Sequence, residues 1–80
     1  MGLESWKRAC LRAVGDRELL HSLSRDIGYT LTSHDDEFHR QLRNHIADLC
    51  ESITDDFSRG MMLALVEVID GHRLRMKGKV

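Results

Sequence analysis

Proline is absent from this chain of 80 residues, and aromatic residues make up only 5% of it. Proline interrupts helices and is common in the turns and edge strands of β proteins, so its absence favours helices over an all-β or irregular domain. The 41% apolar and 31% charged composition is typical of a folded domain rather than a disordered chain. We therefore expect one domain over residues 1–80, with a thin core because so short a chain buries relatively little surface.

Long apolar runs are also missing, and cysteine is rare. The longest apolar run, Met61 to Val66, is far shorter than the roughly 20 residues that cross a bilayer, so we expect no membrane contact and a cytoplasmic location. The two cysteines, Cys10 and Cys50, match no metal-binding spacing. Both occupy apolar positions of expected helices, which predicts buried, reduced thiols.

The first part of the chain has apolar residues at three- and four-residue steps. The stripe from Leu3 through Trp6 to Val14 predicts an amphipathic helix. Gly15 can end that helix in the left-handed conformation, and Asp16 can cap the next one. The sequence therefore predicts a tight helix-to-helix corner at this point.

A second helix is predicted over about residues 17–27, with Gly28 as its C-terminal stop. Residues 29–32 are β-branched or aromatic in part, and they could form an extended connection or a short strand. Thr32 or Ser33 can then cap a third helix, because acids follow in the first turn, where the helix dipole stabilises them. The apolar stripe of this third helix is Phe38, Leu42, Ile46, Leu49, Cys50 and Ile53.

The C-terminal half leaves its helix boundaries open. Residues 54–56, Thr-Asp-Asp, can cap a fourth helix that ends at Gly71. The apolar register also permits a single helix over residues 34–70. We expect the break, and hence an all-α fold, a small bundle of three to four amphipathic helices.

An α+β fold is the alternative. Asp70-Gly71 lies between two runs of period-two alternation, which predicts a C-terminal β-hairpin at residues 63–77. Residues 29–32 could supply the third strand that a hairpin needs for stability. Good helix formers in the first half of the hairpin segment argue against this alternative.

Charge is segregated along the chain, although the net charge is only −1. Residues 35–70 carry nine acids against three bases, whereas residues 71–80 carry four bases and no acid. A basic C-terminal tail at about residues 72–80 could neutralise phosphates. Its cations are the candidate nucleic-acid contacts: Arg73, Arg75, Lys77 and Lys79.

Five histidines suggest a metal site, but their spacing does not support one. His34 and His45 share a helix face, yet lie roughly 16 Å apart along it. Only Asp35 and His39 form an i,i+4 pair, and two ligands do not make a site. The chain also lacks a nucleophile elbow and a glycine-rich phosphate loop. We therefore predict no catalytic residue, no metal, no cofactor and no enzymatic activity.

Protein–protein interaction remains as the expected function. Residues 61–69 place apolar side chains all around one helix, more than a small bundle readily covers, although a fully internal helix would show the same pattern. We predict a homodimer that acts as a small regulatory, adaptor or inhibitor protein. A nucleic-acid-binding accessory protein that uses the basic C-terminal segment is the alternative. The predicted interface residues are Trp6, Phe57, Met61, Met62, Leu65, Val68 and Ile69.

Overall fold

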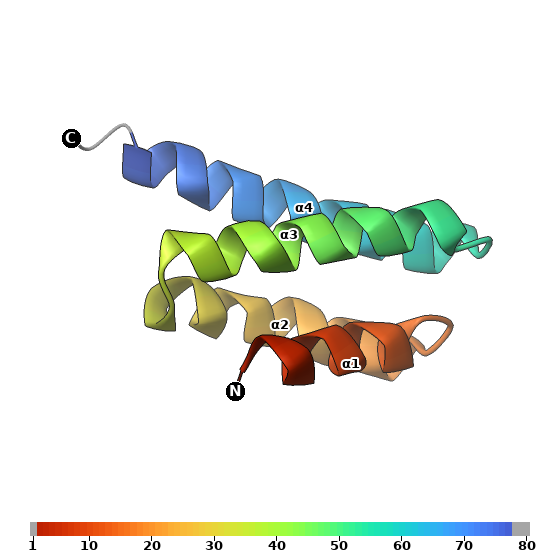
Figure 1. The fold of residues 1–80 in the computed structure, drawn as a ribbon. Helices are drawn as coiled ribbons and strands as arrows, with labels where there is room; N and C mark the ends of the chain where they lie inside the picture. Colours follow the sequence, from red (N-terminus) through yellow and green to blue (C-terminus); the bar gives the residue numbers. More distant parts are fainter. Residues whose placement is uncertain (1, 78–80) are drawn as a thin grey trace.

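The computed structural model describes residues 2–77, which form four helices: α1 (Leu3–Ala13), α2 (Arg17–Ser33), α3 (Asp36–Ser52) and α4 (Asp56–Lys77). The helices lie in two layers, α1 with α2 and α3 with α4 (Figure 1). No strand occurs in this part of the chain. The predicted all-α bundle is confirmed.

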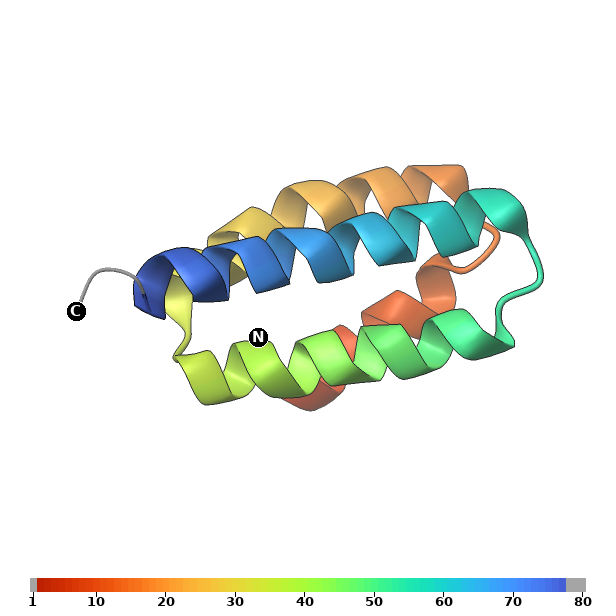
Figure 2. The same cartoon turned by 90° about the horizontal axis from the view of Figure 1, so that it is seen from above.

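Each helix packs mainly on two neighbours. The principal contacts join α1 to α2, α2 to α4, α4 to α3 and α3 to α1. Figure 2 shows α4 alongside α2 on one side of the bundle, with α3 and α1 on the other. It follows that α1 and α4 are diagonal to one another. The bundle measures 39 × 22 × 18 Å, and α4, with 22 residues, runs along most of the longest dimension.

An aspartate begins each helix after the first. The carboxylates of Asp16, Asp35 and Asp55 accept hydrogen bonds from the backbone N–H three residues later, at 3.1, 2.9 and 3.0 Å. These bonds satisfy amides that a helix N-terminus leaves without partners. Gly15 has a φ of +81°, the left-handed conformation that glycine adopts without strain. The predicted corner at this glycine and the predicted break before α4 are both confirmed.

Helix α2 is longer than its sequence pattern predicts. It passes through Gly28 and ends at Ser33, so the predicted stop, the extended segment and the cap at Thr32 or Ser33 are wrong. Thr30 and Leu31 are buried in the bundle. Because burial of a side chain such as Leu31 contributes about 1.5–3 kcal/mol, it outweighs the cost of about 1 kcal/mol for a glycine inside a helix.

Helix α4 is also continuous through the segment for which a hairpin was the alternative. The β-hairpin at residues 63–77 is therefore wrong, as is the predicted stop at Gly71. Two ion pairs tie this part of α4 to α3. Arg43 Nε lies 3.1 Å from Asp70 Oδ1, and the guanidinium of Arg73 contacts the N-terminal turn of α3. Packing along a whole neighbouring helix outweighs the local Asp-Gly turn signal.

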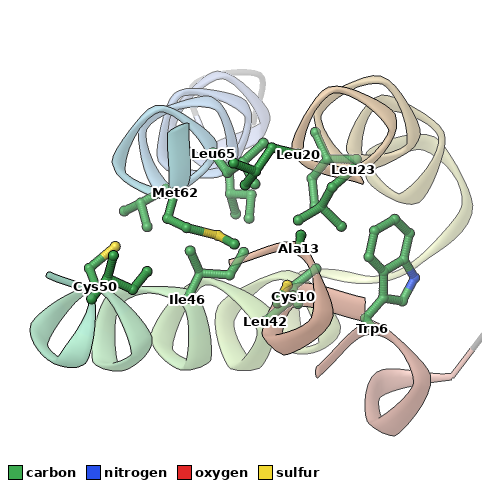
Figure 3. Close-up of a cluster of buried hydrophobic side chains, with 14 of the residues drawn as sticks. Trp6, Cys10, Ala13, Leu20, Leu23, Leu42, Ile46, Cys50, Met62 and Leu65 are labelled. Atoms are coloured by element: carbon green, nitrogen blue, oxygen red, sulfur yellow. The ribbon is translucent and has the colours of Figure 1, made fainter. Parts of the chain in front are cut away.

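The core lies between the two layers, and its buried side chains come from all four helices (Figure 3). The predicted stripe of α3 supplies Leu42 and Ile46, neither of which is exposed. Cys10 and Cys50 are both buried and free, as predicted, and burial raises the pKa of the Cys10 thiol to about 11. The buried apolar residues are Trp6, Cys10, Ala13, Leu20, Leu23, Ile27, Leu31, Leu42, Ile46, Cys50, Ile53, Met62, Leu65, Val66 and Ile69.

Gly28 provides a stabilising substitution. It lies inside α2 with a helical backbone, and a Cβ placed on it would meet no atom within 4 Å. We expect Gly28→Ala to raise the free energy of unfolding by about 0.5–1 kcal/mol, because alanine loses less backbone entropy on folding. Urea unfolding followed by circular dichroism measures this change. A loss of stability would mean that a neighbour occupies this space.

Candidate interaction surfaces

The structure divides the seven predicted interface residues into two groups. Buried in the bundle are Trp6, Met62, Leu65 and Ile69, none of which is more than 4% exposed. At the surface are Val68, which is 46% exposed, and Phe57 and Met61, which are half-buried. The inner face of α4 is thus internal to the bundle, and of the predicted interface residues on α4 a partner can reach only Phe57, Met61 and Val68.

The outer face of α4 carries further apolar side chains that the sequence reasoning did not select. Leu63 is 47% exposed and Leu74 is 70% exposed. Together with Val68, the exposed Glu67 and the small residues Gly60, Ala64 and Gly71, they define what we call the outer face of α4. The helical period places these positions on the side of α4 opposite the buried residues. The sequence alone does not identify them, because it does not show which side of α4 contacts α2 and α3.

Large and small residues alternate along this face. The two glycines lie within a regular helix, and a Cβ at Gly60 or Gly71 would meet nothing within 4 Å. Glycine costs about 1 kcal/mol relative to alanine inside a helix. The single chain therefore gains nothing from these glycines, whereas a second helix could approach the backbone closely at both of them.

The two ends of α4 carry opposite charge. Asp55 and Asp56 lie at its N-terminus, and the exposed Arg75 and Lys77 lie in its last turn. Each sign is the one that the helix dipole favours at that end. Two α4 helices packed antiparallel would therefore place acidic ends against basic ends.

The predicted basic tail is helical as far as Lys77, and one of its four cations is already neutralised. Arg73 Nε donates to Asp36 Oδ1 at 2.7 Å, and the hydrogen bond to Arg73 lowers the pKa of the Asp36 carboxyl. Arg75 and Lys77 remain exposed, whereas Lys79 lies outside the described residues. Because Arg73 is engaged within the chain, it is less available than Arg75 and Lys77 to contact a phosphate.

The N-terminal turns of α3 and α4 predict how stability depends on pH. Hydrogen bonds from Arg73 to Asp36 and from Ser58 to Asp55 lower the pKa of each carboxyl, and Arg40 lowers that of Glu37 to about 2. A carboxylate whose pKa is lower in the folded chain contributes stability above its unfolded pKa and loses it as the pH falls through its folded pKa. We expect the free energy of unfolding to fall steadily from about pH 4.5 towards pH 2.

The variant Asp36→Asn tests this pH dependence. It should reduce the slope of the free energy of unfolding against pH. Asp48→Asn is the control, because Asp48 is an exposed α3 carboxylate without an ion pair within residues 2–77. Urea unfolding at several pH values gives the slopes. Equal slopes in the two variants would contradict a stabilising role for the Asp36–Arg73 pair.

Three histidines gather where α2 passes into α3. A cleft of about 490 Å³ is lined in part by His34, His39 and His72. The rings of His39 and His72 pack edge to face, with 5.4 Å between their centroids. His39 is buried, and its Nε2 donates to the carbonyl of Thr30 at 3.0 Å. Within the described residues, no group of three or more His, Cys, Asp or Glu side chains could hold a metal ion.

No protein-family model, curated protein or solved structure matches the chain. None of the helices in residues 2–77 combines the length and apolar character needed to cross a membrane.

Proposed function

We propose that this chain is a non-enzymatic protein-interaction protein, a small regulator, adaptor or inhibitor, which forms a homodimer through the outer face of α4. The observation that supports this function best is the alternation of large and small residues on that face. The partner at this face is a second copy of the chain, because the large residues of one copy can pack against the small residues of the other.

The outer face of α4 is complementary to itself when two copies lie antiparallel. Residues 63 and 71, and residues 60 and 74, are placed symmetrically about Glu67. Each leucine, Leu63 or Leu74, therefore lies opposite a glycine, Gly71 or Gly60, of the other copy. In a parallel pair, leucine would face leucine and glycine would face glycine, which leaves gaps. A two-fold axis that relates identical surfaces is the usual symmetry of soluble dimers.

The charges of α4 favour the same orientation. An antiparallel pair places Asp56 near Lys77 of the other copy at both ends of the contact, and it sets the two helix dipoles side by side in opposite directions, which is favourable. The two Glu67 carboxylates repel one another near the axis, which keeps the dimer weak. A single helix face is also smaller than the ~800 Å² per partner of a standard interface. We expect a dissociation constant on the order of 10 μM.

The variant Leu63→Glu tests the proposed function. It replaces an apolar contact with Gly71 of the other copy by a second negative charge one turn from Glu67, so we expect a monomer at concentrations where the unmodified chain dimerises. Leu11→Glu is the matched control, because Leu11 is 55% exposed on α1, the helix diagonal to α4. Sedimentation velocity of the two variants and the unmodified chain gives the comparison. Equal dimerisation of Leu63→Glu and Leu11→Glu would remove the outer face of α4 as the interface.

A glycine variant tests whether the two α4 helices pack closely at their glycines or only make a non-specific apolar contact. Gly71→Ala adds one methyl group to a helix with open space around it, so we expect the isolated chain to gain stability, as we also expect for Gly28→Ala. In the dimer, the same methyl group would lie against Leu63 of the other copy and weaken association by about tenfold. Gly28→Ala should leave association unchanged.

A further inference from the structure

Trp6 carries a hydrogen-bond donor that the structure does not satisfy. The residue is 4% exposed, and its Nε1–H is buried and has no acceptor within residues 2–77. Figure 3 shows the indole nitrogen on the side of the ring that faces away from Cys10, Ala13 and Leu42. Most buried polar groups in proteins have a partner, so an unsatisfied one calls for an explanation.

The unsatisfied donor lies beside an open groove between α1 and α2. A cleft of about 240 Å³ is lined by four apolar and three polar residues: Trp6, Ala9, Leu19 and Leu23, with Arg12, Ser22 and Asp26. A second cleft of about 270 Å³ shares Trp6 with the first and continues towards the C-terminal end of α2. Leu19 is 42% exposed at this groove. The two clefts adjoin at Trp6 and Asp26 and form one groove, apolar beside the indole and more polar towards the C-terminal end of α2. The first cleft has room for a leucine or phenylalanine side chain.

The two edges of the groove carry opposite charge. On the α1 edge, Arg8 and Arg12 are exposed and form no ion pair within the described residues. Arg12 lines both the 240 Å³ cleft and an adjoining hollow of about 420 Å³ that Arg8 also lines. On the α2 edge, Asp26 is exposed and is likewise without an ion pair in the described part of the chain. Two cations against one carboxylate favour an anionic occupant along α1.

We propose that the α1–α2 groove binds an acidic amphipathic segment of a partner protein. An apolar side chain of the segment fills the cleft beside Trp6, and its carboxylates lie against Arg8 and Arg12. A small rotation of the indole then brings its Nε1–H, which is inaccessible in the free chain, to an oxygen atom of the segment. The proposal rests on the proposed function and supplies the chemistry of the partner. Because α1 is diagonal to α4, a dimer through α4 leaves both grooves open and can bind two segments at once.

The probe is a blocked, fluorescein-labelled peptide of about 15 residues, built from Glu and Leu so that one helical face is apolar. A matched peptide has Lys in place of Glu. Fluorescence anisotropy measures binding of each peptide to the full chain. Because Trp6 is the only tryptophan, its emission reports independently on occupancy of the groove. We expect the Glu peptide to bind, with a change in Trp6 emission, and the Lys peptide to bind at least about tenfold more weakly.

Three variants test individual features of the groove, and a fourth is a control. Arg12→Glu should weaken binding of the Glu peptide about tenfold, whereas Asp26→Asn should strengthen it about twofold to threefold. Trp6→Phe keeps an aromatic side chain, although a smaller one, and removes the donor, and it should weaken binding about threefold to tenfold. Arg25→Glu is the control on α2 outside the groove, and should change binding less than Arg12→Glu does. Since Arg12 and Asp26 are exposed, their variants test the groove even if Trp6→Phe does not fold.

Three results would overturn the inference: no binding of the Glu peptide up to about 1 mM, equal binding of the Lys peptide, or no effect of Arg12→Glu. Failure of the dimer proposal can be distinguished from failure of the groove proposal, because the Leu63→Glu variant, which we expect to be a monomer, keeps the α1–α2 groove. If the Glu peptide binds to this variant with unchanged affinity, the result supports the proposed binding groove, whether or not the unmodified chain dimerises.

Discussion

Met62→Ala is expected to lower the free energy of unfolding by about 2–5 kcal/mol. The Met62 side chain points into the core between α4 and α3, as Figure 3 shows, and has no exposed surface. Its truncation removes buried apolar contacts and leaves a cavity. A chain of this size has a total stability of only about 4–12 kcal/mol, so this one change removes a large fraction of it. Urea unfolding at about 1 μM, below the expected dissociation constant, measures the effect on the single chain.

The neighbouring position supplies the control for this prediction. Leu63 is adjacent in sequence but 47% exposed on the outer face of α4, so Leu63→Ala should change the stability of the single chain by less than about 0.5 kcal/mol. The pair of variants thus tests whether α4 has an inner face that stabilises the fold and an outer face that does not. Equal losses for the two variants would mean that α4 is oriented differently.

Ser58→Ala is expected to lower the free energy of unfolding by about 1–3 kcal/mol. The Ser58 hydroxyl is fully buried, accepts the N–H of Gly15 at 2.8 Å and donates to Asp55 Oδ2 at 2.6 Å. It joins the corner between α1 and α2 to the start of α4. Alanine would leave the glycine N–H without a partner and would weaken the cap of α4.

A second measurement distinguishes this network from a simple packing loss. Because the hydrogen bond from Ser58 lowers the pKa of the Asp55 carboxyl, Ser58→Ala should raise that pKa towards its ordinary value in an NMR titration. Ser52→Ala is the control, since the exposed Ser52 hydroxyl donates only to a carbonyl of its own helix. An unchanged Asp55 pKa in Ser58→Ala would contradict the network.

The sequence was informative where local chemistry determines the structure. Gly15 and Asp16 mark a real corner because a left-handed glycine and a capping carboxylate act within a few residues of themselves. The stripe of α3 was predictable because its apolar residues recur at the helical period. Leu42 and Ile46 are accordingly buried.

The sequence misled where distant packing outweighs a local signal. Gly28 and Gly71 resemble helix stops, yet α2 and α4 continue through them because the residues beyond them contact neighbouring helices. For example, Arg73 reaches Asp36 on α3, a contact between residues 37 positions apart. Local propensity contains no information about such contacts.

The candidate surfaces were only partly predictable, for a related reason. The apolar side chains of α4 surround the helix, and the sequence does not show which of them α2 and α3 cover. Leu65 and Ile69 proved to be core residues, whereas Leu63 and Leu74 are exposed. The unsatisfied Trp6 donor has no sequence signal, since it depends on which acceptors the folded chain places beside the indole.

Sedimentation equilibrium of the unmodified chain, from about 1 μM to about 1 mM, tests the proposed dimer most directly. The self-complementary outer face of α4 predicts a mass that rises from that of one chain, 9.2 kDa, towards twice that value across this range. A mass that stays at 9.2 kDa up to the highest concentration would contradict it.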